Sequence, residues 1–116
     1  MDCERNAVKR ILKKFRRDHP QLQVIVNEDS LSSNAPHIRD LEQYSCHYIF
    51  GTKEGDHKFL FQNVDQAVKE GRTVELSIPD EKFEDITHYF RIVYNAPLNK
   101  SNQDILVTFV EYLRYY

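Results

Sequence analysis

Two neighbouring carboxylates, Glu28 and Asp29, are the residues whose type and position most favour chemistry in this sequence. They follow the apolar run 22–26, which is rich in β-branched residues and predicts a strand. Carboxylates just past the carboxyl end of a parallel strand lie where open α/β sheets bind their ligands, and their oxygens suit a hard cation such as Mg²⁺. A solvated acidic loop that helps to cap the next helix would have the same residues, so residue type alone leaves both interpretations open.

The histidines and cysteines show no spacing typical of a metal site or a catalytic nucleophile. No histidine stands four residues from another, and Cys3 and Cys46 have neither CxxC spacing nor a paired histidine motif. We therefore expect the histidines to be structural or surface residues and the cysteines to be reduced thiols of a cytoplasmic protein. The five histidines are His19, His37, His47, His57 and His88.

The segment Gly51–Asp56 has two glycines before a predicted helix, an arrangement also found in phosphate-binding loops. It lacks the Gly-Lys-Ser/Thr ending, which supplies the phosphate-binding lysine and the magnesium-binding hydroxyl of such loops. We therefore interpret this segment as a turn in which Asp56 caps the helix that follows.

Composition and charge limit the partners of the chain. Its 116 residues are 41% hydrophobic and 29% charged, which is typical of a folded domain, and no apolar run is long enough to cross a membrane. The net charge of −2 argues against strong autonomous binding of nucleic acid. Basic residues gather at the start, where residues 1–18 hold seven basic and three acidic side chains. We expect this basic face to be a solvated face of an amphipathic helix.

The elements that must position the carboxylates form an αβαβ series. A helix is predicted from Asp2 to about Arg17, followed by the strand 22–26, whose consecutive apolar residues predict burial on both faces. Ser33 or Asn34 caps a second helix over 36–43, and Tyr48–Phe50 is the next strand. Strand, helix and strand of these lengths predict a parallel βαβ unit with a right-handed crossover.

The second half predicts a helix and an antiparallel sheet. The helix opens at Asp56 and stops at Gly71. Strands are expected at 73–78, 87–94 and 105–112. The last segment is apolar at both odd and even positions, so a helix remains possible there. The expected fold class is therefore α/β (α+β), with an αβαβ unit followed by a helix and a β-rich segment.

Six motifs along the chain carry a family resemblance. They are Asn6-Ala7-Val8-Lys9-Arg10, Arg16-Arg17-Asp18-His19-Pro20, Val24-Ile25-Val26-x-Glu28-Asp29, Ser33-Asn34-x-Pro36-His37-Ile38, Gly51-x-Lys53-x-Gly55-Asp56-His57-Lys58-Phe59-Leu60-Phe61 and Tyr94-Asn95-x-Pro97-Leu98-Asn99-x-Ser101-Asn102-x-Asp104. In this order they resemble the DDE transposases of bacterial insertion sequences, over nearly the whole chain.

The resemblance implies a ribonuclease-H-like catalytic core, in which three carboxylates hold two Mg²⁺ or Mn²⁺ ions for DNA cleavage and strand transfer. Asp29 matches the second carboxylate, as a catalytic residue and metal ligand, and we expect Lys53 and Lys58 to bind nucleic acid. The chain is expected to be one domain, in which residues 1–55 are part of the core and 56–116 begin a β-rich insertion.

Departures from the family pattern limit the activity expected of residues 1–116. The first aspartate of the family lies upstream of this segment and the glutamate lies downstream, so the chain is expected to be inactive alone and to bind no metal by itself. DNA binding is expected to be weak or absent, and self-association to occur through the strand 22–26. Two other interpretations remain open: a small cytosolic protein-interaction module, and a metal-dependent nuclease built from Glu28, Asp29 and Asp56.

Overall fold

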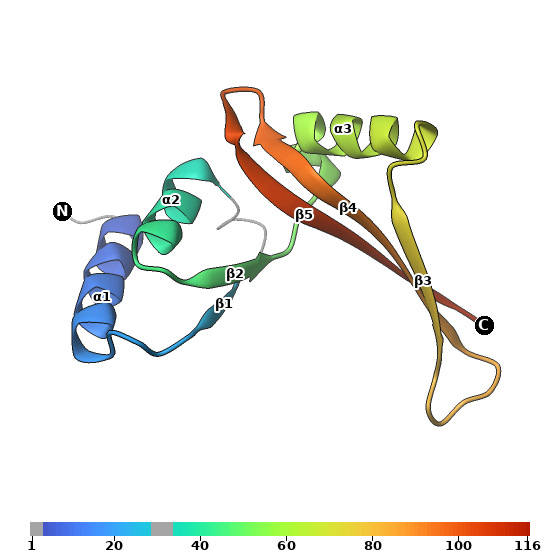
Figure 1. Ribbon diagram of the computed structural model, residues 1–116, viewed down its shortest axis with the longest axis horizontal. Helices are drawn as coiled ribbons and strands as arrows, with labels where there is room; N and C mark the ends of the chain where they lie inside the picture. Colours follow the sequence, from blue (N-terminus) through green and yellow to red (C-terminus); the bar gives the residue numbers. More distant parts are fainter. Residues whose placement is uncertain (1–3, 29–33) are drawn as a thin grey trace. The chain divides into compact units, whose positions relative to one another are not determined.

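The computed structural model describes residues 4–28 and 34–116 (Figure 1). Helices and strands are both present, so the mixed α/β class predicted from the sequence is confirmed. The chain forms two compact units, Met1–Asp56 and His57–Tyr116. The division expected from the sequence, between residues 55 and 56, lies one residue from this boundary.

The first unit contains a parallel βαβ arrangement. Helix α1 (Glu4–Asp18) precedes strand β1 (Ile25–Glu28), and helix α2 (Ala35–Gln43) connects β1 to strand β2 (His47–Phe50). The two strands pair in parallel from Ile25 opposite His47 to Glu28 opposite Phe50. The predicted order of elements and the parallel pairing are therefore correct.

Only one face of this two-stranded sheet is covered. Its core joins α1, α2 and both strands, and it consists of Leu12, Leu41 and Cys46 with Val8, Val24, Val26, Tyr44, Tyr48 and Phe50 packed against them. On the other face Ile25 is 63% exposed and Ile49 is 62% exposed. The prediction that the first strand is buried on both faces is wrong for this unit, because helices pack on one face alone.

The first strand also begins later than predicted. Residues 22–26 are expected as the strand, whereas β1 spans Ile25–Glu28. Leu22 is 52% exposed and lies in a turn closed from its amide nitrogen to the carbonyl of His19. The Leu22 carbonyl accepts a hydrogen bond from Arg16 at 2.7 Å, so a side chain takes the acceptor that a sheet ladder would use.

Helix α2 has a cap at each end. The side chain of Asn34 accepts a hydrogen bond from the backbone nitrogen of His37 at 3.0 Å, so Asn34 is the predicted cap, while Ser33 lies outside the described residues. At the other end Ser45 has φ of 56°, and the amides of Ser45 and Cys46 bond back to Glu42 and Leu41. This is a Schellman ending with serine at the position that glycine usually occupies.

Helix α3 (Lys58–Lys69) opens the second unit, after a short 3₁₀ turn, η2 (Glu54–Asp56). The residue at the N-cap position is His57, so the expectation that Asp56 caps this helix is wrong by one position. Gly71, with φ of 73°, is the predicted stop. The amide of Gly71 bonds to Val68, which completes the same type of ending as in α2.

An antiparallel sheet follows α3, in the strand order β3-β4-β5 (Figure 1). Its strands are β3 (Val74–Pro79), β4 (Thr87–Asn99) and β5 (Asn102–Tyr115). The segment 105–112, for which a helix remained possible, is a strand. A bulge interrupts the β4–β5 ladder between Val93 and Ala96, where Asn95 has φ of 56°.

Helix α3 covers one face of this sheet and leaves the other open. The core of the second unit consists of Leu60, Val64, Ala67, Val93, Ala96 and Phe109, with Phe61 and Val107 against it. The opposite face is apolar but exposed: Val74 43%, Leu76 46%, Ile78 49%, Val110 54% and Tyr112 49%. The second unit thus buries apolar side chains on the face that α3 covers and leaves those on the other face exposed.

Candidate functional site

The carboxyl end of β1 holds the first candidate carboxylate. Glu28 is the last residue of β1, and its Oε1 lies 3.0 Å from Nε2 of His37 in the first turn of α2. Because a carboxylate only accepts, Nε2 of His37 carries the proton and donates it. Asp29, the residue expected to be catalytic, lies outside the described residues.

His37 of α2 contacts the ends of both β1 and β2 at this end of the sheet. Its side chain is 7% exposed, and its ring stacks on Phe50, at the end of β2, with a centroid distance of 5.6 Å. The hydrogen bond to Glu28 adds the end of β1 to this contact. The strand end that leads into Asp29 is therefore held by a buried side chain from the crossover helix.

This pairing was not foreseen from the sequence, where His37 is expected to be a structural or surface histidine. It is structural in the sense that it is buried, but its partner is the candidate carboxylate. A signal for the contact is present in Asn34-x-Pro36-His37, because a capped helix start places His37 in the first turn, which faces the strand end in a βαβ unit.

The predicted nucleic-acid-binding lysines are both exposed. Lys53 precedes η2, and its carbonyl accepts the amide of Asp56 at 3.1 Å. Lys58 is the first residue of α3. Lys53 belongs to the first unit and Lys58 to the second. Each is exposed, so each can contact a partner such as DNA.

The described residues do not form a metal site by themselves. Among residues 4–28 and 34–116, no three His, Cys, Asp or Glu side chains are grouped so that they could hold a metal ion. Glu28 is engaged with His37, and Asp56 is exposed in η2. Any divalent ion at the end of β1 would need Asp29 and further ligands in addition.

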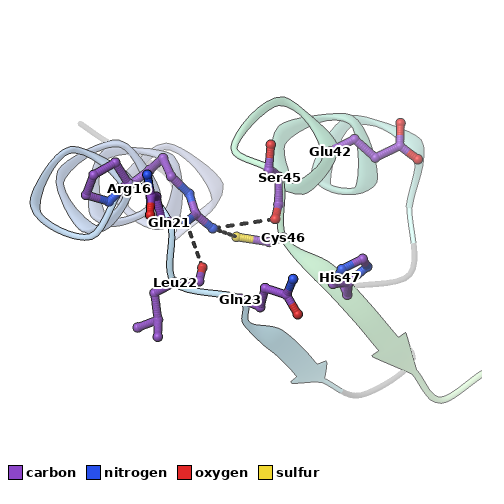
Figure 2. Close-up of a pocket in the computed structure, with 9 residues that line it drawn as sticks. Arg16, Gln21, Leu22, Gln23, Glu42, Ser45, Cys46 and His47 are labelled. Atoms are coloured by element: carbon purple, nitrogen blue, oxygen red, sulfur yellow. Dashed lines mark hydrogen bonds between the residues drawn. The ribbon is translucent and has the colours of Figure 1, made fainter.

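A pocket of about 440 Å³ opens where α1, the loop after it and the end of α2 meet (Figure 2). Arg16 lies at its centre and joins the two sides. Its donors reach main-chain carbonyls at Tyr44 (2.8 Å), Leu22 (2.7 Å), His19 (3.0 Å) and Ser45 (3.5 Å). Figure 2 shows the guanidinium pointing across the pocket toward Ser45 and Cys46.

These contacts decide what the pocket can do. A guanidinium that is free to bind phosphate presents its fork of donors to the ligand. In Arg16 those donors are directed to carbonyls of the same chain, so the side chain serves as a brace between α1 and the α2–β2 turn. Part of the basic character of α1 is thus used internally, rather than on the solvated face that the sequence predicts.

A second hydrogen-bond chain lies on the open face of the sheet in the second unit. Asp80 Oδ1 accepts from Nε2 of His88 at 2.8 Å, and Nδ1 of His88 is 2.7 Å from the hydroxyl of Tyr112. Asp80 Oδ2 accepts the amides of Lys82 and Phe83 at 2.9 and 3.0 Å. The hydrogen bond from His88, followed by those from the two amides, lowers the pKa of Asp80 to about 2.

A basic groove of about 360 Å³ runs along α1. Asn6, Lys9, Arg10, Lys13 and Tyr44 line it. Lys9 also lies 3.8 Å from Asp40 of α2, which partly neutralises the groove. Three basic side chains line the groove, and Lys9 shares its charge with Asp40.

No family model, no curated protein and no solved structure matches this chain. None of the helices in the described residues is both long and apolar enough to span a membrane.

Proposed function

We propose that this chain is a segment of a DDE transposase, an enzyme that cleaves DNA strands and transfers them to a new site. The proposal begins with the six motifs that resemble this family. The observation that carries it is the parallel βαβ unit, in which the carboxyl end of β1 leads directly into Asp29. Such a strand end is where α/β sheets place catalytic carboxylates.

In this proposal Asp29 is the second of three metal-binding carboxylates in a ribonuclease-H-like core. Glu28 and His37 hold the strand end, because their hydrogen bond joins β1 to the crossover helix. The other two carboxylates are supplied by sequence outside residues 1–116. The chain alone is therefore inactive, and Mg²⁺ or Mn²⁺ binds only when all three carboxylates are present.

The second unit corresponds, in this proposal, to the start of a β-rich insertion between core segments. Its antiparallel order β3-β4-β5 and the helix before it agree with that expectation. Lys53 of the first unit and Lys58 of the second each contact the DNA backbone. Their contribution is small, because the net charge of −2 gives little long-range attraction for phosphates.

The DNA on both sides of the coding sequence tests the proposal. We expect upstream codons for a strand with an aspartate, downstream codons for a helix with a glutamate, and terminal inverted repeats that enclose both. Interrupted reading frames would still support the proposal, since they would mark a decayed element. Unrelated genes on both sides, with neither the missing strands nor inverted repeats, would contradict it.

A protein-interaction module is the second candidate function, and one observation favours it. The open face of the second unit exposes Val74, Leu76 and Ile78 by 43–49%, a contiguous apolar surface of the kind that partners cover. The flanking DNA separates the two candidates, because a module kept for binding needs no neighbouring catalytic segments.

A further inference from the structure

The outer edge of β5 is the longest open strand edge in the part of the chain that the structure describes. β5 is 14 residues long and pairs on one side only, with β4. The opposite edge, β3, has 6 residues and ends in Pro79, and β1 and β2 have 4 residues each. Open N–H and C=O groups along an edge are a template for another strand, and β5 contains neither proline nor lysine to oppose it.

The side chains of β5 alternate cleanly between two faces. Phe109, 9% exposed, lies in the core with α3, and Ile105, 4% exposed, lies four residues before it and so on the same face of the sheet. The even-numbered positions lie on the open face, and all of them are exposed: Asp104, Leu106, Thr108, Val110, Tyr112 and Arg114. This face thus carries an acidic residue near one end of the strand, a basic residue near the other, and mostly apolar residues between them.

We propose that β5 pairs in antiparallel orientation with β5 of a second copy of this chain, about a twofold axis at Phe109. Asp104 and Arg114 are equally far from Phe109 in the sequence, so the axis places Asp104 of each copy opposite Arg114 of the other. Leu106 then lies opposite Tyr112, and their apolar side chains meet on the same face. The two three-stranded sheets become one sheet of six strands.

The charges select this register over its neighbours. A register must shift by two residues to keep the same side chains on the same face. Centred on Thr108, the pairing places Asp104 opposite Tyr112, and centred on Val110 it places Arg114 opposite Leu106. Both shifts lose the two cross-strand ion pairs, whereas the register centred on Phe109 makes both.

The same charges favour a second copy over an unrelated strand. A twofold interface requires a surface that is complementary to itself, and one acid and one base at equal distances from a central residue meet that requirement. This inference is independent of the proposed function. The sequence predicted self-association through the strand 22–26, whereas this inference places it at β5.

Sedimentation equilibrium of the full chain and its charge variants tests the inference. We expect a concentration-dependent dimer. Asp104→Arg and Arg114→Asp each replace two attractive pairs with two repulsive ones, so each is expected to weaken the dimer by about tenfold or more. The double variant exchanges the charges, and it is expected to restore the wild-type dissociation constant to within about threefold.

The matched control is Glu81→Arg, which makes the same charge change at an exposed position in the β3–β4 loop and is expected to leave the dimer unchanged. A monomer at all concentrations, a dimer that neither single variant weakens, or a double variant that stays monomeric would overturn the inference. Should a reversed charge unfold the chain by circular dichroism, Asp104→Asn and Arg114→Gln provide the same test, and both must weaken the dimer.

Discussion

Arg16, His37 and His88 each bond to a partner outside their own helix or strand, 28, 9 and 8 residues away in the sequence. From the sequence, Arg16 belongs to a basic helix face, and the two histidines lack the spacing of a metal or catalytic site. In the structure each bridges segments whose proximity exists only after folding: Arg16 to Tyr44, His37 to Glu28 and His88 to Asp80. Residue type predicts that such groups need partners but does not identify the partner.

Replacement of Arg16 tests its role as a brace. Arg16→Met keeps most of the apolar stem and removes the donors to four carbonyls, so we expect the free energy of unfolding to fall by about 1–3 kcal/mol. Arg16→Lys should recover only part of this loss, because an ammonium cannot form the planar fork.

The control is Arg17→Met. The Arg17 side chain is 72% exposed, so this substitution should change the free energy of unfolding by less than about 0.5 kcal/mol. Urea denaturation measures all three, and equal losses at both positions would contradict the brace.

Asp80 makes the stability of the second unit sensitive to acid. Its pKa is lowered from 3.8 to about 2 by His88 and two main-chain amides, so the charged form is favoured in the folded state. The resulting stabilisation is complete above pH 3.8 and is lost as the pH falls through about 2. Asp80→Asn should remove this part of the pH dependence, while Glu81→Gln should keep it. Thermal unfolding between pH 5 and 2 measures the effect, and identical profiles for Asp80→Asn and the wild type would refute it.

Helices and strands were more predictable than their boundaries. The helix expected over 36–43 is present as α2 with Asn34 as its cap, and its apolar residues Ile38 and Leu41, three positions apart, are buried together. The start of β1 was misplaced because Arg16 takes the carbonyl of Leu22, a contact with no signal in the strand itself. Helix caps are local and can be predicted, whereas the point at which a strand begins to pair depends on its neighbours.

The two Schellman endings make a matched pair of predictions. Ser45 adopts the left-handed conformation at the end of α2, whereas Gly71 occupies the equivalent position after α3. Ser45→Gly should therefore raise the free energy of unfolding by about 0.5–1 kcal/mol, and Gly71→Ala should lower it by about 1 kcal/mol. Gly55→Ala is the control, since no heavy atom lies within 4 Å of an added Cβ and no positive φ is required. Denaturant titrations in which Ser45→Gly lowers stability would contradict this assignment of strain.

At the scale of the whole molecule, composition predicted a folded chain but not how incompletely each unit is covered. Both sheets have helices on one face only, so Ile25 and Ile49 in the first unit and Leu76 in the second remain largely exposed. Alternation along a strand shows which side chains share a face, and it contains no information on whether anything covers that face. The open surfaces agree with the proposal that these units are parts of a larger assembly, which would supply further strands or a second copy.

Asp29, as one of three metal-binding carboxylates, is the residue on which the proposed activity most depends. The most direct measurement is an assay of metal-dependent DNA strand transfer. The protein to assay is the longer polypeptide encoded by this sequence together with the coding DNA on both sides of it. We predict activity with Mg²⁺ or Mn²⁺ that is abolished in Asp29→Asn and retained in Asp56→Asn, an exposed carboxylate that serves as the matched control. Strand transfer that persists in Asp29→Asn, or metal-dependent cleavage by residues 1–116 alone, would contradict the account.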